Sequence, residues 1–138
     1  MNCPHCGVHV DEHPENACFN AWVATGVMEI DSIRRHDKKG PGRVVEAYAV
    51  YSDDSEDGYA MYWLNSDFYN YSGHIAAAWR VVEKVLKKDV LARVRLDSGS
   101  FAWTVWVSNK DISTWASGET APLAICRAAI KATKESEL

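Results

Sequence analysis

Residues 73–107 predict one helix followed by one hairpin, and the rest of the fold is predicted around them. Their sequence is GHIAAAWRVVEKVLKKDVLARVRLDSGSFAWTVWV. Its first half, Gly73–Lys88, predicts a helix with Ser72 as a candidate N-cap. Apolar residues recur there at helical spacing and are expected to form one buried stripe of Ile75, Trp79, Val82 and Leu86. Lysines cluster at the end of the helix, where a positive charge complements the helix dipole.

The second half of the stretch predicts two strands that alternate apolar and polar residues around a two-residue turn, Ser98-Gly99. That register places Asp97 opposite Ser100. One face, expected to be core, then carries the pairs Leu96/Phe101, Val94/Trp103, Ala92/Val105 and Val90/Val107. The other face carries Arg95/Ala102, Arg93/Thr104 and Leu91/Trp106.

Outward from this stretch, two further strands are predicted at Val44–Tyr51 and Tyr59–Leu64, joined by the acidic connection SDDSEDG. Helices are predicted at Ala17–Met28 and at Glu119–Lys134, the latter burying Leu123, Cys126 and Ile130. The segment Arg34–Arg43 has no apolar anchor and predicts a basic loop. We therefore expect an α+β fold, with an antiparallel sheet of about four strands layered with three helices as a helix-sheet-helix sandwich.

The chain opens on Cys3-Pro4-His5-Cys6-Gly7, a C-x-x-C-G turn that lets two thiolates reach one metal ion while the glycine frees the backbone to donate to sulfur. The remaining ligands must come from His9, His13 and Cys18, and we favour His13 and Cys18. We expect a structural zinc; metal-free surface thiols and a catalytic metal are the alternatives. Residues 1–18 are then a zinc-knuckle-like segment, and residues 19–138 form one compact domain.

Composition and charge limit the classes of partner that the protein can bind. The 138 residues carry a net charge of −4 and the pI is about 5.7, which argues against duplex DNA as a partner, because such binding needs clustered positive charge. Six Trp and six Tyr are more than a small core holds, which favours a ligand surface or a homo-oligomer contact. No secretory or membrane segment is evident, and the cysteine spacing suits a reducing cytoplasm.

No motif predicts catalysis. The acidic run Asp53–Gly58 imitates the first half of a calcium loop, but its twelfth position is Leu64, where calcium needs a bidentate Glu. His36-Asp37 lacks the further histidines of a metal hydrolase, and no nucleophile elbow or phosphate loop is present. We therefore do not expect an enzyme.

Two segments, His74–Lys84 (HIAAAWRVVEK) and Thr120–Lys131 (TAPLAICRAAIK), resemble the most recognisable stretches of the phage ABA sandwich domain family. The resemblance extends over most of Ala17–Lys134. It implies a phage origin and a layered arrangement of helices and sheet. By analogy with other small phage proteins, it also raises the prospect of a sponge that sequesters nucleotide signals of bacterial immunity.

The residues best suited to such a ligand are arginines next to an indole, since the ring stacks a base while guanidinium binds phosphate. The candidates on the second hairpin and in the basic loop are Arg93, Arg95, Thr104, Trp106, Arg34, Arg35 and Arg43. The leading hypothesis is an anti-defence protein that binds a cyclic nucleotide or ADP-ribose derivative in the cytoplasm of the infected host cell. The alternative is a zinc-stapled module that binds a host protein or single-stranded nucleic acid; a hydrolase of the same signals is a third class.

Overall fold

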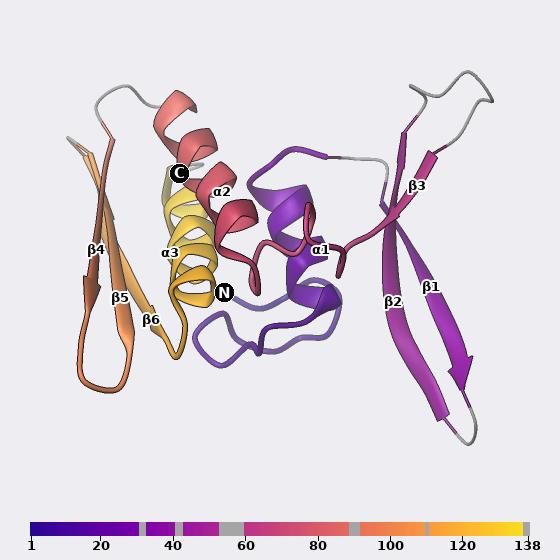
Figure 1. Cartoon of the computed structure of the whole chain (residues 1–138). Helices are drawn as coiled ribbons and strands as arrows, with labels where there is room; N and C mark the ends of the chain where they lie inside the picture. The colour runs from indigo at the N-terminus through magenta and orange to yellow at the C-terminus, as the bar shows by residue number, and fades with distance from the viewer. Residues whose placement is uncertain (31–32, 41–42, 53–59, 89–91, 110, 137–138) are drawn as a thin grey trace.

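A layer of three helices lies between two antiparallel sheets (Figure 1). The structure, a computed structural model, describes residues 1–30, 33–40, 43–52, 60–88, 92–109 and 111–136. The helices are α1 (Ala17–Gly26), α2 (Ile75–Lys88) and α3 (Ala121–Ser136). The first sheet, in the order β1-β2-β3, consists of β1 (Ile33–Gly40), β2 (Arg43–Ser52) and β3 (Ala60–Trp63). The second, in the order β4-β5-β6, consists of β4 (Arg93–Ser98), β5 (Trp103–Ser108) and β6 (Ser113–Gly118).

The predicted α+β class, the three helices and both predicted strand pairs are confirmed. The described part of the chain holds six strands in two sheets, however, rather than about four in one, and the helices form the middle layer. Helix α3 explains this order. It is apolar on several sides, so it packs against β5 and β6 as well as against α1 and α2.

The sequence analysis did not predict two of the strands, β1 and β6. β1 was expected to be a basic loop, yet Ile33–Gly40 pairs along its whole length with β2 through the backbone, which needs no apolar side chain. The end of this ribbon extends beyond the helices in Figure 1. β6 was missed because its inward positions are small, Ala116 and Gly118 among them. The acidic run Asp53–Gly58 lies outside the described residues.

The predicted register of the second hairpin is wrong by four residues. Ser98 pairs with Trp103, so the turn is Gly99–Ala102 and its Gly99 N–H donates to the Ala102 carbonyl. A longer turn leaves Phe101 almost fully exposed instead of in the core. Because four is an even number, every strand residue keeps its predicted face. The pairs that involve Val90 and Leu91 lie outside the described residues.

The predicted buried stripe of α2 is also wrong at three of its four positions. Ile75, Trp79 and Leu86 are 52%, 53% and 39% exposed, whereas Ala77, Ala78 and Val81 face the core next to Val82. Small alanines on the buried side let α2 approach α3 closely, so the larger side chains remain outside. Ser72 is not the N-cap, because the helix begins three residues later.

Asn20 organises the junction between α1 and the segment before α2. It is fully buried, and its Nδ2 donates to the Leu64 carbonyl at 2.5 Å and to Asn70 Oδ1 at 2.9 Å. Its Oδ1 accepts from the Ser72 N–H and hydroxyl at 2.9 and 2.7 Å. Four hydrogen bonds satisfy the buried amide in full, which makes it a specific lock between these elements.

Replacing Asn20 by Leu should lower the free energy of unfolding by about 2–4 kcal/mol, since it leaves the buried Leu64 carbonyl and Ser72 N–H without partners. Urea unfolding followed by circular dichroism measures the change. Thr25→Ala, an exposed position on the same helix, is the matched control and should cost less than about 1 kcal/mol. Equal effects of the two substitutions would contradict the lock.

The predicted homo-oligomer stays a prediction, and the exposed strip of Ile75, Trp79 and Leu86 is where it would bury apolar surface. If copies of the chain associate there, Trp79→Asp should convert the oligomer to a monomer without loss of helix content. Light scattering coupled to size exclusion gives the mass. An unchanged mass would place any association elsewhere.

Candidate functional site

The N-terminal segment folds back on itself as a knuckle. Asn2 and His9 form an isolated antiparallel bridge, and the Cys3 N–H donates to the Val8 carbonyl at 2.9 Å. Gly7 has φ +80°, a conformation that favours glycine, and its N–H returns to the Cys3 carbonyl at 2.9 Å. The His5 N–H points at Cys3 Sγ at 3.4 Å. This turn sets two cysteines side by side, as the C-x-x-C-G spacing predicts.

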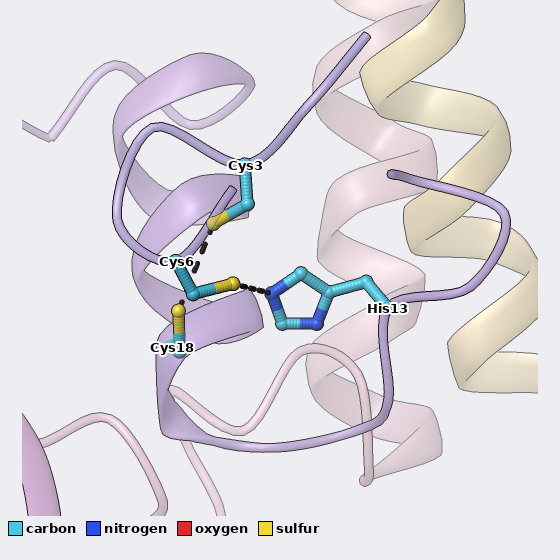
Figure 2. A group of neighbouring side chains, drawn as sticks. All are labelled: Cys3, Cys6, His13 and Cys18. Atoms are coloured by element: carbon cyan, nitrogen blue, oxygen red, sulfur yellow. Dashed lines mark hydrogen bonds between the residues drawn. The ribbon is translucent and has the colours of Figure 1, made fainter. Parts of the chain in front are cut away.

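The side chains of Cys3, Cys6, His13 and Cys18 converge, as Figure 2 shows, and their ligand atoms lie within 4.8 Å of one another. Cys3 Sγ is 3.7 Å from Cys18 Sγ, and Cys6 Sγ is 3.3 Å from His13 Nε2. Tetrahedral zinc, with Zn–S of about 2.3 Å and Zn–N of about 2.0 Å, would give S···S and S···N edges of about 3.8 and 3.5 Å. The group is therefore close enough to hold a metal ion and fits a zinc knuckle.

The surroundings of the cluster also suit a metal. His13 is fully buried and stacks on Phe19 at 4.7 Å, and its Nδ1 lies 2.9 Å from the Pro14 carbonyl. A proton on Nδ1 would leave Nε2 as a ligand atom facing Cys6. Burial raises the pKa of the Cys3 and Cys18 thiols and lowers the pKa of His13. Neutral histidine is the ligand form, and a bound cation offsets the penalty on the thiolates.

The predicted choice of ligands is thus confirmed as a geometric group. His9, the alternative, lies outside it: its Nδ1 accepts from the Asp11 N–H at 3.2 Å and is 3.7 Å from the Asp11 carboxylate. The fourth cysteine, Cys126, is buried in α3 and does not belong to the cluster. Sequence reasoning missed Arg127, whose guanidinium donates to the carbonyls of His13 and Ser117 and so joins the knuckle to β6.

A second candidate site is the outward face of the sheet β4-β5-β6. The registers define three rows of outward residues: Arg93–Ser108–Ser113, Arg95–Trp106–Trp115 and Asp97–Thr104–Ser117. The Arg95 guanidinium lies 4.3 Å from the centre of the Trp106 ring and pairs with Asp97 at 2.9 Å. We call these nine residues the outer face.

An open hollow of about 550 Å³ lies over this surface, lined by Arg93, Val94, Arg95, Trp106, Ser108 and Ser113. The structure therefore brings together four of the predicted ligand residues on one face: Arg93, Arg95, Thr104 and Trp106. It does not bring the other three to them. Arg34, Arg35 and Arg43 belong to β1 and β2, in the sheet on the far side of the helices (Figure 1).

Trp115, 58% exposed, is an outer-face residue that sequence reasoning missed because β6 itself was missed. The signal was present in STWASG, residues 113–118. Its alternate positions Ser113, Trp115 and Ser117 face outward, which is the period of a strand.

Fold and cluster together define a small α+β sandwich protein with a zinc-knuckle-like N-terminus. Residues 21–130 match the Phage ABA sandwich domain, and the chain belongs to this family. The crystal structure of a phage protein from Bacillus cereus ATCC 14579 is similar, with a TM-score of 0.54 and 21% identity over 90% of this chain and 91% of that chain. At this identity the likeness shows the fold. No curated protein matches the chain.

The family match begins after Cys18, so the knuckle lies on the N-terminal side of the matched range. Across the described residues, none of the helices has the length and apolar character that crossing a membrane requires.

If the cluster holds a structural metal, Cys18→Ser should abolish metal retention and lower the free energy of unfolding by more than about 3 kcal/mol, because binding energy at such sites is folding energy. Plasma mass spectrometry of the purified protein measures one metal per chain. Cys126→Ser, which changes a buried cysteine outside the cluster, should keep the metal. Full metal retention by Cys18→Ser would show that Cys18 is not a ligand.

Proposed function

We propose that this phage protein binds and sequesters a small nucleotide-derived signal of bacterial immunity, a cyclic nucleotide or ADP-ribose derivative, at the outer face. The observation that carries the proposal is Arg95 stacked on Trp106 with Arg93 on the same face of β4. An indole supplies a platform for any base, and a guanidinium matches the paired oxygens of a phosphate. This pairing supports a ligand that carries both an aromatic base and a phosphate.

The ion pair between Arg95 and Asp97 does not block the site. Their side chains are 69% and 51% exposed, and pairs at such exposure contribute only about 0–1 kcal/mol. A phosphate can therefore replace the carboxylate at small cost. The guanidinium already lies against the ring, so less side-chain freedom is lost when the ligand binds.

We propose zinc as the metal of the knuckle, in a structural role. Four protein ligands complete a tetrahedron, whereas catalytic zinc keeps one position open for water. Cys3 and His13 are buried next to α1, and the buried Cys18 lies in its first turn. The site therefore holds the N-terminus in place instead of presenting a metal to a substrate.

We also propose that binding proceeds without catalysis, in the cytoplasm of the infected host. Of the nine outer-face positions, Asp97 is the one carboxylate, so the face has no second carboxylate to share general acid–base work. Sequestration needs no turnover. It needs only a ligand held tightly enough to keep it from its receptor.

The alternative function is an interaction module that docks the knuckle on a host protein or on single-stranded nucleic acid. The exposure of Pro4, His5 and Cys6 on the turn favours it. Substituting the exposed Pro4 by Glu separates the two functions, because it alters the surface of the turn and removes no metal ligand. Unchanged capture of the nucleotide by Pro4→Glu supports the outer face.

Calorimetric titration with a panel of cyclic nucleotides and ADP-ribose derivatives should reveal one tight ligand, and mass spectrometry should recover it intact. Arg95→Ala should weaken that binding about tenfold or more, since it removes a charge-assisted contact. Arg34→Ala, on the other sheet, should leave it unchanged. Flat titrations across the panel would contradict the proposal, and a converted product would contradict sequestration without turnover.

A further inference from the structure

The outer face carries a second tryptophan directly beside the first. In the ladder between β5 and β6, Trp106 is the partner of Trp115, and Arg95 is the partner of Trp106 on the other side. Directly opposite residues on one face have Cβ atoms about 4.5–5.5 Å apart. The middle row is thus one arginine followed by two adjacent indoles.

Trp115 lines a hollow of its own, of about 460 Å³, together with Met1, His9, Val10, Asp11, Ser113, Thr114 and Lys131. Lys131 Nζ lies 5.8 Å from the centre of the Trp115 ring and donates to the Trp115 carbonyl at 3.2 Å. This second hollow repeats the composition of the first, an indole with a cation beside it. Ser113 lines both hollows, so they adjoin one another.

We infer that the two hollows form one bipartite site for a dinucleotide, with one base on Trp106 and the other on Trp115. Arg93 and Arg95 bind phosphate on the Trp106 side of the site, and Lys131 does so on the Trp115 side. This inference rests on the proposed function and specifies its ligand class. Adjacent strands lie about 4.8 Å apart, so two bases joined by a phosphodiester can reach both platforms. A mononucleotide occupies only one of them.

The charges around the face agree with a phosphodiester ligand. Lys131 pairs with Asp11 at 2.6 Å, as Arg95 pairs with Asp97, so each half carries a cation whose carboxylate partner is about half exposed. A phosphate can replace Asp97 on Arg95, whose side chain is 69% exposed. The Lys131 side chain is only 19% exposed, so it keeps its pair with Asp11 and binds a phosphate beside Trp115 as a further partner. Arg93 adds a third cation to the face. Binding should therefore weaken as salt concentration rises.

The test compares AMP with the linear dinucleotide pApA and with a cyclic dinucleotide of adenine, by calorimetry on the full chain. The wild type should bind one of the two dinucleotides at least tenfold more tightly than AMP, because the second stacked base contributes binding energy. Trp115→Ala should remove this advantage, so that the preferred dinucleotide binds no more tightly than AMP. Trp79→Ala, an exposed tryptophan on α2 of nearly equal accessibility, is the matched control and should change neither.

Equal affinity for AMP and both dinucleotides, with Trp115→Ala unchanged and Arg95→Ala weakened, would overturn the bipartite site and leave the proposed function intact. Absence of binding to all three probes by the folded wild type would overturn the bipartite site for adenine nucleotides. Titration with the wider panel of cyclic nucleotides and ADP-ribose derivatives then decides the proposed function separately. Circular dichroism and thermal melts of each variant verify that the fold is kept.

Discussion

The convergence of three thiols and one imidazole, with only Cys6 exposed among the four side chains, is the constraint on which the rest of the structure depends. Without a cation, burial penalises the thiolate forms of Cys3 and Cys18, whereas a divalent metal turns the same burial into a closed, stable site. Cys18 lies in the first turn of α1. The cluster therefore fixes where the first helix begins and how the preceding residues fold over it.

From this centre, contacts extend to both sheets. His5 meets Tyr48 of β2 edge-on at 5.2 Å, and Arg127 of α3 ties the His13 carbonyl to Ser117 of β6. The knuckle therefore contacts one sheet directly and is linked to the other through Arg127 of α3. Its position also explains how a segment outside the family match can affect the outer face, since Lys131 contacts both Asp11 of the knuckle and Trp115.

Much of the chemistry could be predicted from the sequence because it depends on short spacings. The metal group follows from C-x-x-C-G and the next nearby ligands, and the placement of Arg95 and Trp106 on the same non-core face follows from the period of a strand. The predicted register is wrong by four residues, and because four is even each residue still lies on its predicted face of the sheet. The rest depends on tertiary packing. The apolar stripe of α2 has the period expected for burial, but alanines of the same helix face the core instead. Strand β1 forms through backbone pairing with β2, which no side-chain pattern in the sequence predicts.

We propose that one zinc ion, bound by three sulfurs and one nitrogen, holds the N-terminus and α1 together. X-ray absorption at the zinc edge of the purified protein measures the ligand set directly. The spectrum should show three sulfur neighbours at about 2.3 Å and one nitrogen at about 2.0 Å, with no water ligand. A protein that is fully folded without metal, or a zinc shell dominated by oxygen, would contradict it.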